Sequence, residues 1–109
     1  MFENHLTHIE YPTPDQKAQQ RWDVSGIIKG RNQRFKFDTR PLRKIHNIIG
    51  KKINTKSRAE KMVFETKDTF IVADLQELNT HMRAHNIVVI RLKEVVNSLN
   101  WNIILPKTD

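Results

Sequence analysis

The sequence predicts an α+β fold, a single compact domain in which an antiparallel sheet packs against about three helices. Strands with one buried face are predicted where apolar and polar residues alternate, over 22–28, 33–38 and 101–105. Helices are predicted where apolar residues recur at spacings of three and four, over 40–49, 75–85 and 88–99. The sheet would therefore consist of an N-terminal hairpin and a C-terminal strand. Because 109 residues build one core and are too few for two, we expect one domain over 21–109.

Residues 1–20 are expected to form an N-terminal arm or edge element. The segment from Leu6 to Tyr11 has the composition of a short strand. Pro12 and Pro14 follow it, and prolines break regular structure. We therefore place the start of the domain at residue 21.

A basic hairpin is predicted next. Trp22 and Val24 mark one side of its first strand, and Phe35 and Phe37 alternate with basic residues in its second strand. The residues Lys29-Gly30-Arg31-Asn32 between the strands are typical of a tight turn. The tip of this hairpin is therefore expected to be positively charged.

A basic amphipathic helix is predicted over 40–49. Thr39 can cap it, Pro41 suits its first turn, and Gly50 ends it. Its apolar stripe consists of Leu42, Ile45, Ile48 and Ile49. Its opposite face, continued just past the end of the helix, consists of Arg40, Arg43, Lys44, Asn47, Lys51 and Lys52.

The segment 57–72 has two alternative interpretations. Ser57-Arg58-Ala59-Glu60 has the form of a capping box, which would begin a short helix. The apolar runs 62–64 and 69–72 would instead be two strands around a polar turn. Both alternatives stay open at this point.

Two helices and a strand are predicted for the remainder of the chain. Asp74 begins a second capping-box pattern, and the helix that follows ends at Asn86. A further helix is predicted from about 87 to 99, despite the β-branched run Val88-Val89-Ile90. The last strand begins at Trp101.

This order of helices and strand resembles that of a winged helix-turn-helix domain, from about residue 75 to the C-terminus. The resemblance is architectural, and it implies that the second helix would enter a DNA major groove. The exposed residues of that helix would be Arg91, Lys93, Glu94 and Asn97, a nearly neutral set. We therefore expect the main contact surface elsewhere in the chain.

Positive charge is concentrated in one part of the sequence. The formal net charge at pH 7 is +7. Residues 17–61 hold fourteen basic and three acidic residues, a net charge of +11, whereas the rest of the chain has a net charge of −4. A charge distribution segregated in this way attracts polyanions. We therefore predict a nucleic-acid-binding protein, for DNA or RNA, with a regulatory role such as control of transcription.

Phosphate backbones require several cations close together, and arginine also offers a fork that binds phosphate or guanine with two hydrogen bonds. The hairpin tip and the basic helix supply such cations, and the polar loop after the helix extends the surface. The predicted nucleic-acid-binding residues are Lys29, Arg31, Arg34, Lys36, Arg40, Arg43, Lys44, Lys51, Lys52, Lys56 and Arg58.

Aromatic side chains among these cations would allow bases of a single strand to stack on them. Trp22, Phe35 and Phe37 are the candidates. The stronger interpretation is that these rings form the apolar face of the hairpin and fill the core.

The histidines give little support for a metal site. His81 and His85 are four residues apart and share a helix face, but Met82 stands where a helical zinc protease has its glutamate. The chain contains no cysteine, so thiolate ligands are excluded. We expect neither a metal nor another cofactor.

The competing enzyme class is a small, toxin-like ribonuclease. His46, with Asp38 and Arg43 nearby in sequence, would be its acid or base. A polar neighbour of the core stripe is the stronger interpretation of His46, and we therefore expect binding without chemistry.

A third class is a protein-interaction module that docks an acidic partner. A homodimer through the 88–99 helix is compatible with it and with nucleic-acid binding. No apolar run reaches the length of a membrane span, and residues 1–9 lack the order of a signal peptide. We expect a cytoplasmic protein without membrane contact.

Overall fold

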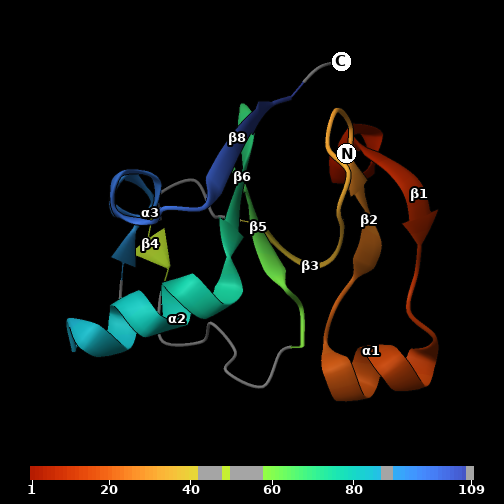
Figure 1. The fold of residues 1–109 in the computed structure, drawn as a ribbon, viewed down its shortest axis with the longest axis horizontal. Helices are drawn as coiled ribbons and strands as arrows, with labels where there is room; N and C mark the ends of the chain where they lie inside the picture. Colours follow the sequence, from red (N-terminus) through yellow and green to blue (C-terminus); the bar gives the residue numbers. More distant parts are fainter. Residues whose placement is uncertain (42–47, 50–57, 87–89, 108–109) are drawn as a thin grey trace.

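A six-stranded sheet curls so that its two edge strands face each other across its concave side (Figure 1). The computed structural model describes residues 1–41, 48–49, 58–86 and 90–107. The strand order in the sheet is β1-β2-β3-β5-β6-β8. The bounds of these strands are β1 Leu6–Glu10, β2 Val24–Ile28, β3 Arg34–Pro41, β5 Lys61–Glu65, β6 Thr69–Asp74 and β8 Asn102–Pro106.

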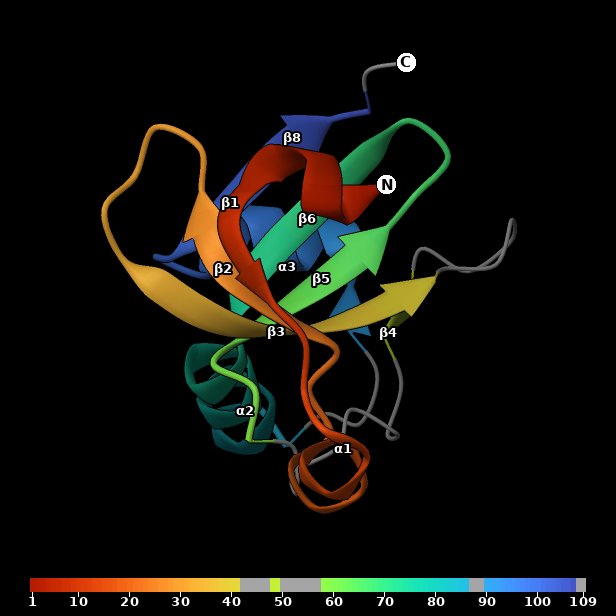
Figure 2. The same cartoon turned by 90° about the vertical axis from the view of Figure 1, so that its right-hand side faces the viewer.

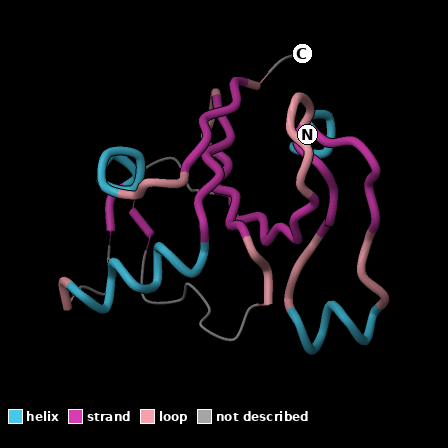
Figure 3. Tube along the Cα trace, viewed as in Figure 1, coloured by secondary structure: helices cyan, strands magenta, loops and turns pink. Residues whose placement is uncertain are grey.

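Among the described residues, three α-helices and a two-stranded ribbon accompany this sheet, so the chain is an α+β protein as predicted (Figure 3). A 3-10 turn, η1, precedes β1, and α1 connects β1 to β2. In Figure 1, α2 and α3 lie on the outer side of β5 and β6. The bounds of these elements are η1 Phe2–His5, α1 Pro14–Gln20, β4 Ile48–Ile49, α2 Leu75–Ala84, β7 Ile90–Arg91 and α3 Leu92–Ser98.

The sheet is mixed, and the prediction of an antiparallel sheet was wrong in this respect. Strands β3 and β5 run parallel, with Phe37 opposite Lys61 and Arg40 opposite Phe64, whereas the other pairs are antiparallel. A parallel pair needs a long crossover connection. The chain between the end of β3 at Pro41 and the start of β5 provides that length.

Each face of the sheet buries its own apolar cluster. Along β5, Val63 points into the inner cluster, whereas Met62 and Phe64 point into the outer one, because successive side chains of a strand alternate between faces. The inner cluster contains Phe2, Leu6, Val24, Ile28, Phe35, Phe37, Val63, Phe70 and Val72. The outer cluster packs the sheet against α2 and α3 and includes Leu75, Leu78, Ile90, Leu92 and Val95.

Local signals in the sequence identified several elements correctly. The basic hairpin forms as β2 and β3, with Val24 opposite Phe37. Of the two interpretations of 57–72, the strand alternative is confirmed, since β5 and β6 pair across a turn in which the Thr66 hydroxyl bonds to Thr69. The Asp74 side chain caps α2 by accepting a hydrogen bond from the backbone N–H of Glu77.

Residues 12–20 differ from the expectation that prolines break regular structure. Pro14 occupies the first turn of α1, where its missing N–H is not needed. Thr13 and Gln16 complete a capping box, in which the Thr13 hydroxyl accepts from the Gln16 N–H and the Gln16 side chain accepts from the Thr13 N–H. The capping box and Pro14 therefore begin a helix at a position where the prolines led us to expect irregular structure.

The prediction of a helix over 40–49 is wrong at both of the ends that the structure describes. Arg40 and Pro41 continue β3, where they pair with Phe64 and Glu65. Ile48 and Ile49 form β4 and pair with β7. Strand pairing across the fold therefore overrides the apolar spacing, and residues 42–47 and 50 of this prediction lie outside the described residues.

The helix predicted over 88–99 begins only at Leu92, because Ile90 and Arg91 form β7 against β4. A β-branched residue such as Ile90 favours an extended backbone, and its side chain is buried in the outer cluster. Residues 87–89 lie outside the described residues. The apolar side chains of α3 pack inward, so its outward face is polar and gives no support to a dimer through it.

Candidate nucleic-acid interface

The predicted nucleic-acid-binding residues divide into described and undescribed positions. The structure describes the surroundings of Lys29, Arg31, Arg34, Lys36, Arg40 and Arg58. The remaining positions, Arg43, Lys44, Lys51, Lys52 and Lys56, lie outside the described residues.

The hairpin tip, defined here as residues 29–33 between β2 and β3, exposes two of these cations. The tip turns at Gly30, whose φ of 86° is readily adopted only by glycine. The backbone N–H of Arg31 donates to the Ile28 carbonyl at 2.9 Å, which closes the turn. Lys29 and Arg31 are both exposed, and Figure 2 shows this loop projecting from the sheet. The tip therefore presents two cations to solvent, as predicted for a charged turn.

Arg34 holds β1 against the hairpin through hydrogen bonds of its guanidinium. Its guanidinium donates to the Ser25 hydroxyl at 2.9 Å and to the His8 carbonyl. Glu10 lies 3.9 Å from the same guanidinium. His8 has a φ of 53°, and the β1–β2 register shifts between Thr7 and Glu10, so this contact occurs at an irregular edge strand. Arg34 therefore has a structural role at this edge, and its hydrogen bonds orient its guanidinium toward β1.

Arg40 and Lys36 also have partners within the protein. The guanidinium of Arg40 forms two hydrogen bonds of 3.2 Å with the carboxylate of Asp38, whose side chain is buried. The Lys36 ammonium lies 5.3 Å from the centre of the Trp22 ring. Because a bidentate pair neutralises arginine and fixes its fork, Arg40 is a weaker phosphate ligand than the exposed cations of the hairpin tip.

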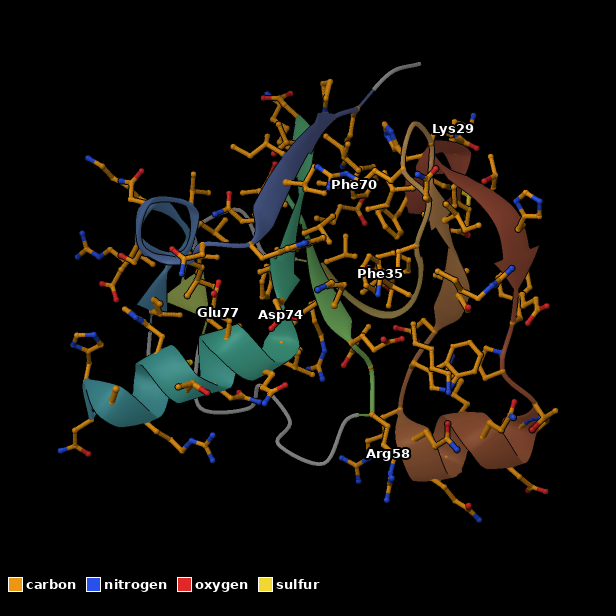
Figure 4. All side chains as sticks on the ribbon, in the orientation of Figure 1. Lys29, Phe35, Arg58, Phe70, Asp74 and Glu77 are labelled. Atoms are coloured by element: carbon orange, nitrogen blue, oxygen red, sulfur yellow. The ribbon has the colours of Figure 1, made fainter. Side chains whose placement is uncertain are left out.

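Arg58 belongs to a second basic group, which lies beside α1. Its backbone N–H donates to the carbonyl of Gln20, the last residue of α1, at 2.8 Å. Lys17 and Arg21 come from α1 and its C-cap, and all three side chains are exposed. In Figure 4, Arg58 and Lys29 lie at opposite ends of the molecule. The described cations therefore form two separate groups instead of one continuous patch.

The aromatic residues predicted as stacking candidates are buried. Trp22 is 4% exposed, Phe35 7% and Phe37 0%, so filling the core is confirmed as their role. Trp101, immediately before β8, is instead half-buried. The sequence did not identify Trp101 as a candidate site residue, because it belongs to an alternating apolar segment. The cations near its ring come from distant parts of the chain.

Trp101 has two cations near its ring. The Lys61 ammonium lies 3.8 Å from the ring centre, and the Arg31 guanidinium lies 5.9 Å from it. Lys61 is only 6% exposed and also lies 4.4 Å from the centre of Phe35. Asp74 accepts a hydrogen bond of 2.7 Å from Lys61 and balances its charge. Lys61 was not among the predicted site residues, because its partners are assembled only by the fold.

A cavity of about 450 Å³ opens at the other end of the concave side. Phe2, Val63 and Phe70 supply apolar lining, and Glu3 and Glu65 line it as well. The ammonium of Lys107, which also lines the cavity, is paired with Glu65 at 2.9 Å. His5 also lines the cavity, but two carboxylates face it and its lysine is already paired with one of them, so this lining favours a phosphate less than the exposed cations of the hairpin tip do.

The histidine pair on α2 lies as the sequence predicts. The rings of His81 and His85 are 4.4 Å apart, and His81 Nε2 is 2.9 Å from a carboxylate oxygen of Glu94 on α3. Within the described ranges, no three His, Cys, Asp or Glu side chains gather into a group that would hold a metal ion. His46, the candidate acid or base of a ribonuclease, lies outside the described residues.

No protein-family model, curated protein or solved structure significantly matches this chain. In the described part of the chain, no helix combines the length and apolarity that crossing a membrane requires.

Proposed function

We propose that this protein binds nucleic acid, DNA or RNA, mainly through the phosphate backbone, without acting on it chemically. The observation that carries the proposal is the net charge of +11 in residues 17–61, against −4 in the rest of the chain. Such segregation destabilises a compact fold by self-repulsion, and it favours association with a polyanion.

The internal ion pairs leave much of this charge uncompensated. Lys17, Arg34, Arg40 and Lys61 each have an acidic partner within 4.0 Å. No ion pair with a described carboxylate engages Lys29, Arg31 or Arg58. These three exposed cations are therefore the described residues best suited to bind phosphate.

The crossover between β3 and β5 adds the largest block of like charge in the sequence. Residues 42–57 contain five basic and no acidic residues. This crossover begins where β3 ends at Pro41 and returns at Arg58, beside α1. We propose that the crossover, the α1 side and the hairpin tip together contact phosphates, and that the protein serves a regulatory role in the cytoplasm.

Binding of the intact protein to labelled single-stranded DNA, double-stranded DNA and RNA, followed by fluorescence anisotropy across a salt series, tests the proposal. Four or more phosphate contacts give a slope of log Kd against log salt of about 3, and a loss of affinity on the order of 100-fold between 50 and 200 mM salt. Absence of binding at low salt would refute the proposal and favour docking to an acidic protein. Cleavage of the labelled strand on a gel would favour a ribonuclease instead.

A further inference from the structure

Trp101 is anchored at its backbone and at its ring, although part of its surface is exposed. Its backbone N–H donates to a carboxylate oxygen of Glu77 at 2.9 Å, which ties the start of β8 to α2. Its ring meets Phe35 in an edge-to-face contact with 5.7 Å between centroids. A planar aromatic surface fixed before binding loses little conformational entropy when a ligand stacks on it. The geometry is therefore that of a preformed stacking surface.

The two cations near the ring differ in accessibility. Lys61 is buried and paired with Asp74, so it belongs to the protein interior. Arg31 lies in the exposed hairpin tip and has no ion pair with a described carboxylate. Of the two cations, Arg31 is therefore the one available to a ligand that contacts Trp101.

From this arrangement we infer that Trp101 and Arg31 form a stacking site for an unpaired base of single-stranded nucleic acid. Every base has a π-face, so indole and guanidinium planes bind unpaired bases with little sequence preference. Lys29, two residues from Arg31 in the same exposed tip, would bind a phosphate next to the stacked base. The inference rests on the proposed function and adds to it a preference for single strands over duplex.

The spacing between guanidinium and indole is close to what a base requires. Stacked bases lie about 3.4 Å apart, so a base between two planes needs a separation of about 7 Å. The present separation of Arg31 from the ring centre is 5.9 Å. A shift of about 1 Å in an exposed turn is sufficient, and rearrangements of this size are common at binding surfaces.

Tryptophan fluorescence tests this inference directly, because the chain has two tryptophans and Trp22 is 4% exposed. We expect oligo(dT) or oligo(U) to quench the emission of the wild-type protein as it binds. The variant W101F should bind with similar affinity and lose the quenching. The variant W101L should lose about 5- to 150-fold in affinity for single strands, the effect of one stacked base. Comparison of oligo(dT) with oligo(U) shows whether DNA or RNA is the preferred source of the base.

Two arginine variants provide the matched comparison. Arg31→Ala should reduce single-strand affinity more than Lys29→Ala, because both remove one charge from the same turn but only Arg31 lies over the ring. Arg83→Ala, at an exposed position on α2, removes one charge elsewhere and should leave affinity within about twofold. Far-UV circular dichroism confirms that each variant is folded.

The outcomes separate the inference from the proposed function. If the wild-type protein binds no nucleic acid, both are refuted. If it binds strands without quenching, and W101L and Arg31→Ala bind as Arg83→Ala does, the stacking site is refuted while phosphate binding stands. Equal affinity of the wild-type protein for duplex and single strand would also overturn the stacking site.

Discussion

Asp74 joins two parts of the fold, and its replacement by alanine is expected to remove two interactions at once. One carboxylate oxygen accepts from the Glu77 N–H at the start of α2, and the other accepts from the buried Lys61 ammonium. Loss of an N-cap costs about 1 kcal/mol. Breaking a buried ion pair costs about 3–5 kcal/mol, and since the Asp74 side chain is 25% exposed we take about 2–3 kcal/mol here. We therefore expect Asp74→Ala to lower the free energy of unfolding by about 3–4 kcal/mol.

Two further variants separate the cap from the ion pair. Asp74→Ser keeps a capping oxygen and removes the charge, so it should cost about 2–3 kcal/mol. The double variant Asp74→Ser with Lys61→Met removes both charges and should lie within about 1 kcal/mol of the wild type. Urea denaturation followed by far-UV circular dichroism measures all three. A cost below about 1 kcal/mol for Asp74→Ala, or no recovery in the double variant, would show that the cap and the ion pair do not stabilise the fold as assigned.

Three other substitutions have defined expectations. Phe37→Ala, at a fully buried position, should lower the free energy of unfolding by about 3–5 kcal/mol in urea denaturation. Ile104→Ala, at a position 50% exposed, should lower it by less than about 1 kcal/mol. Equal costs would contradict the assigned core. Thr13→Ala removes the capping box of α1, a helix with no buried residue, so hydrogen exchange should rise in α1 while the global midpoint changes little. A large shift of the midpoint would show that α1 is part of the cooperative core. Gly26→Ala would place a Cβ 3.1 Å from the Thr7 carbonyl oxygen, so β1 must shift. We expect this shift to cost about 1–3 kcal/mol, measured by thermal unfolding. Unchanged stability would show that β1 moves without measurable cost.

Features determined by neighbouring residues could be predicted from the sequence. The turn at Gly30, the cap at Asp74 and the stop at Asn86, whose φ is 51°, depend on chemistry within four residues. Features determined by distant pairing could not. The spacing of Ile48 and Ile49 fits a helix, yet their partner is a strand some forty residues away in sequence, and tertiary pairing decides their conformation.

The candidate site shows the same division between local and distant determinants. Sequence identifies which residues are cationic, but it does not show which cations the fold neutralises. Arg34 meets Glu10 from a different strand, and Lys61 meets Asp74 across a hairpin. Arg31 and Trp101 lie seventy residues apart in the sequence, so their contact is visible only in three dimensions.

The proposed function depends on the block of positive charge in the crossover, and two double variants test whether this block binds phosphate. Arg43→Ala with Lys44→Ala removes two charges from the crossover, and Lys67→Ala with Lys93→Ala removes two exposed charges from the part of the chain with net charge −4. The slope of log Kd against log salt for a labelled single strand should fall by about one to two units in the first variant and stay unchanged in the second. Equal slopes in both variants and the wild type would contradict the assignment of phosphate binding to this segment.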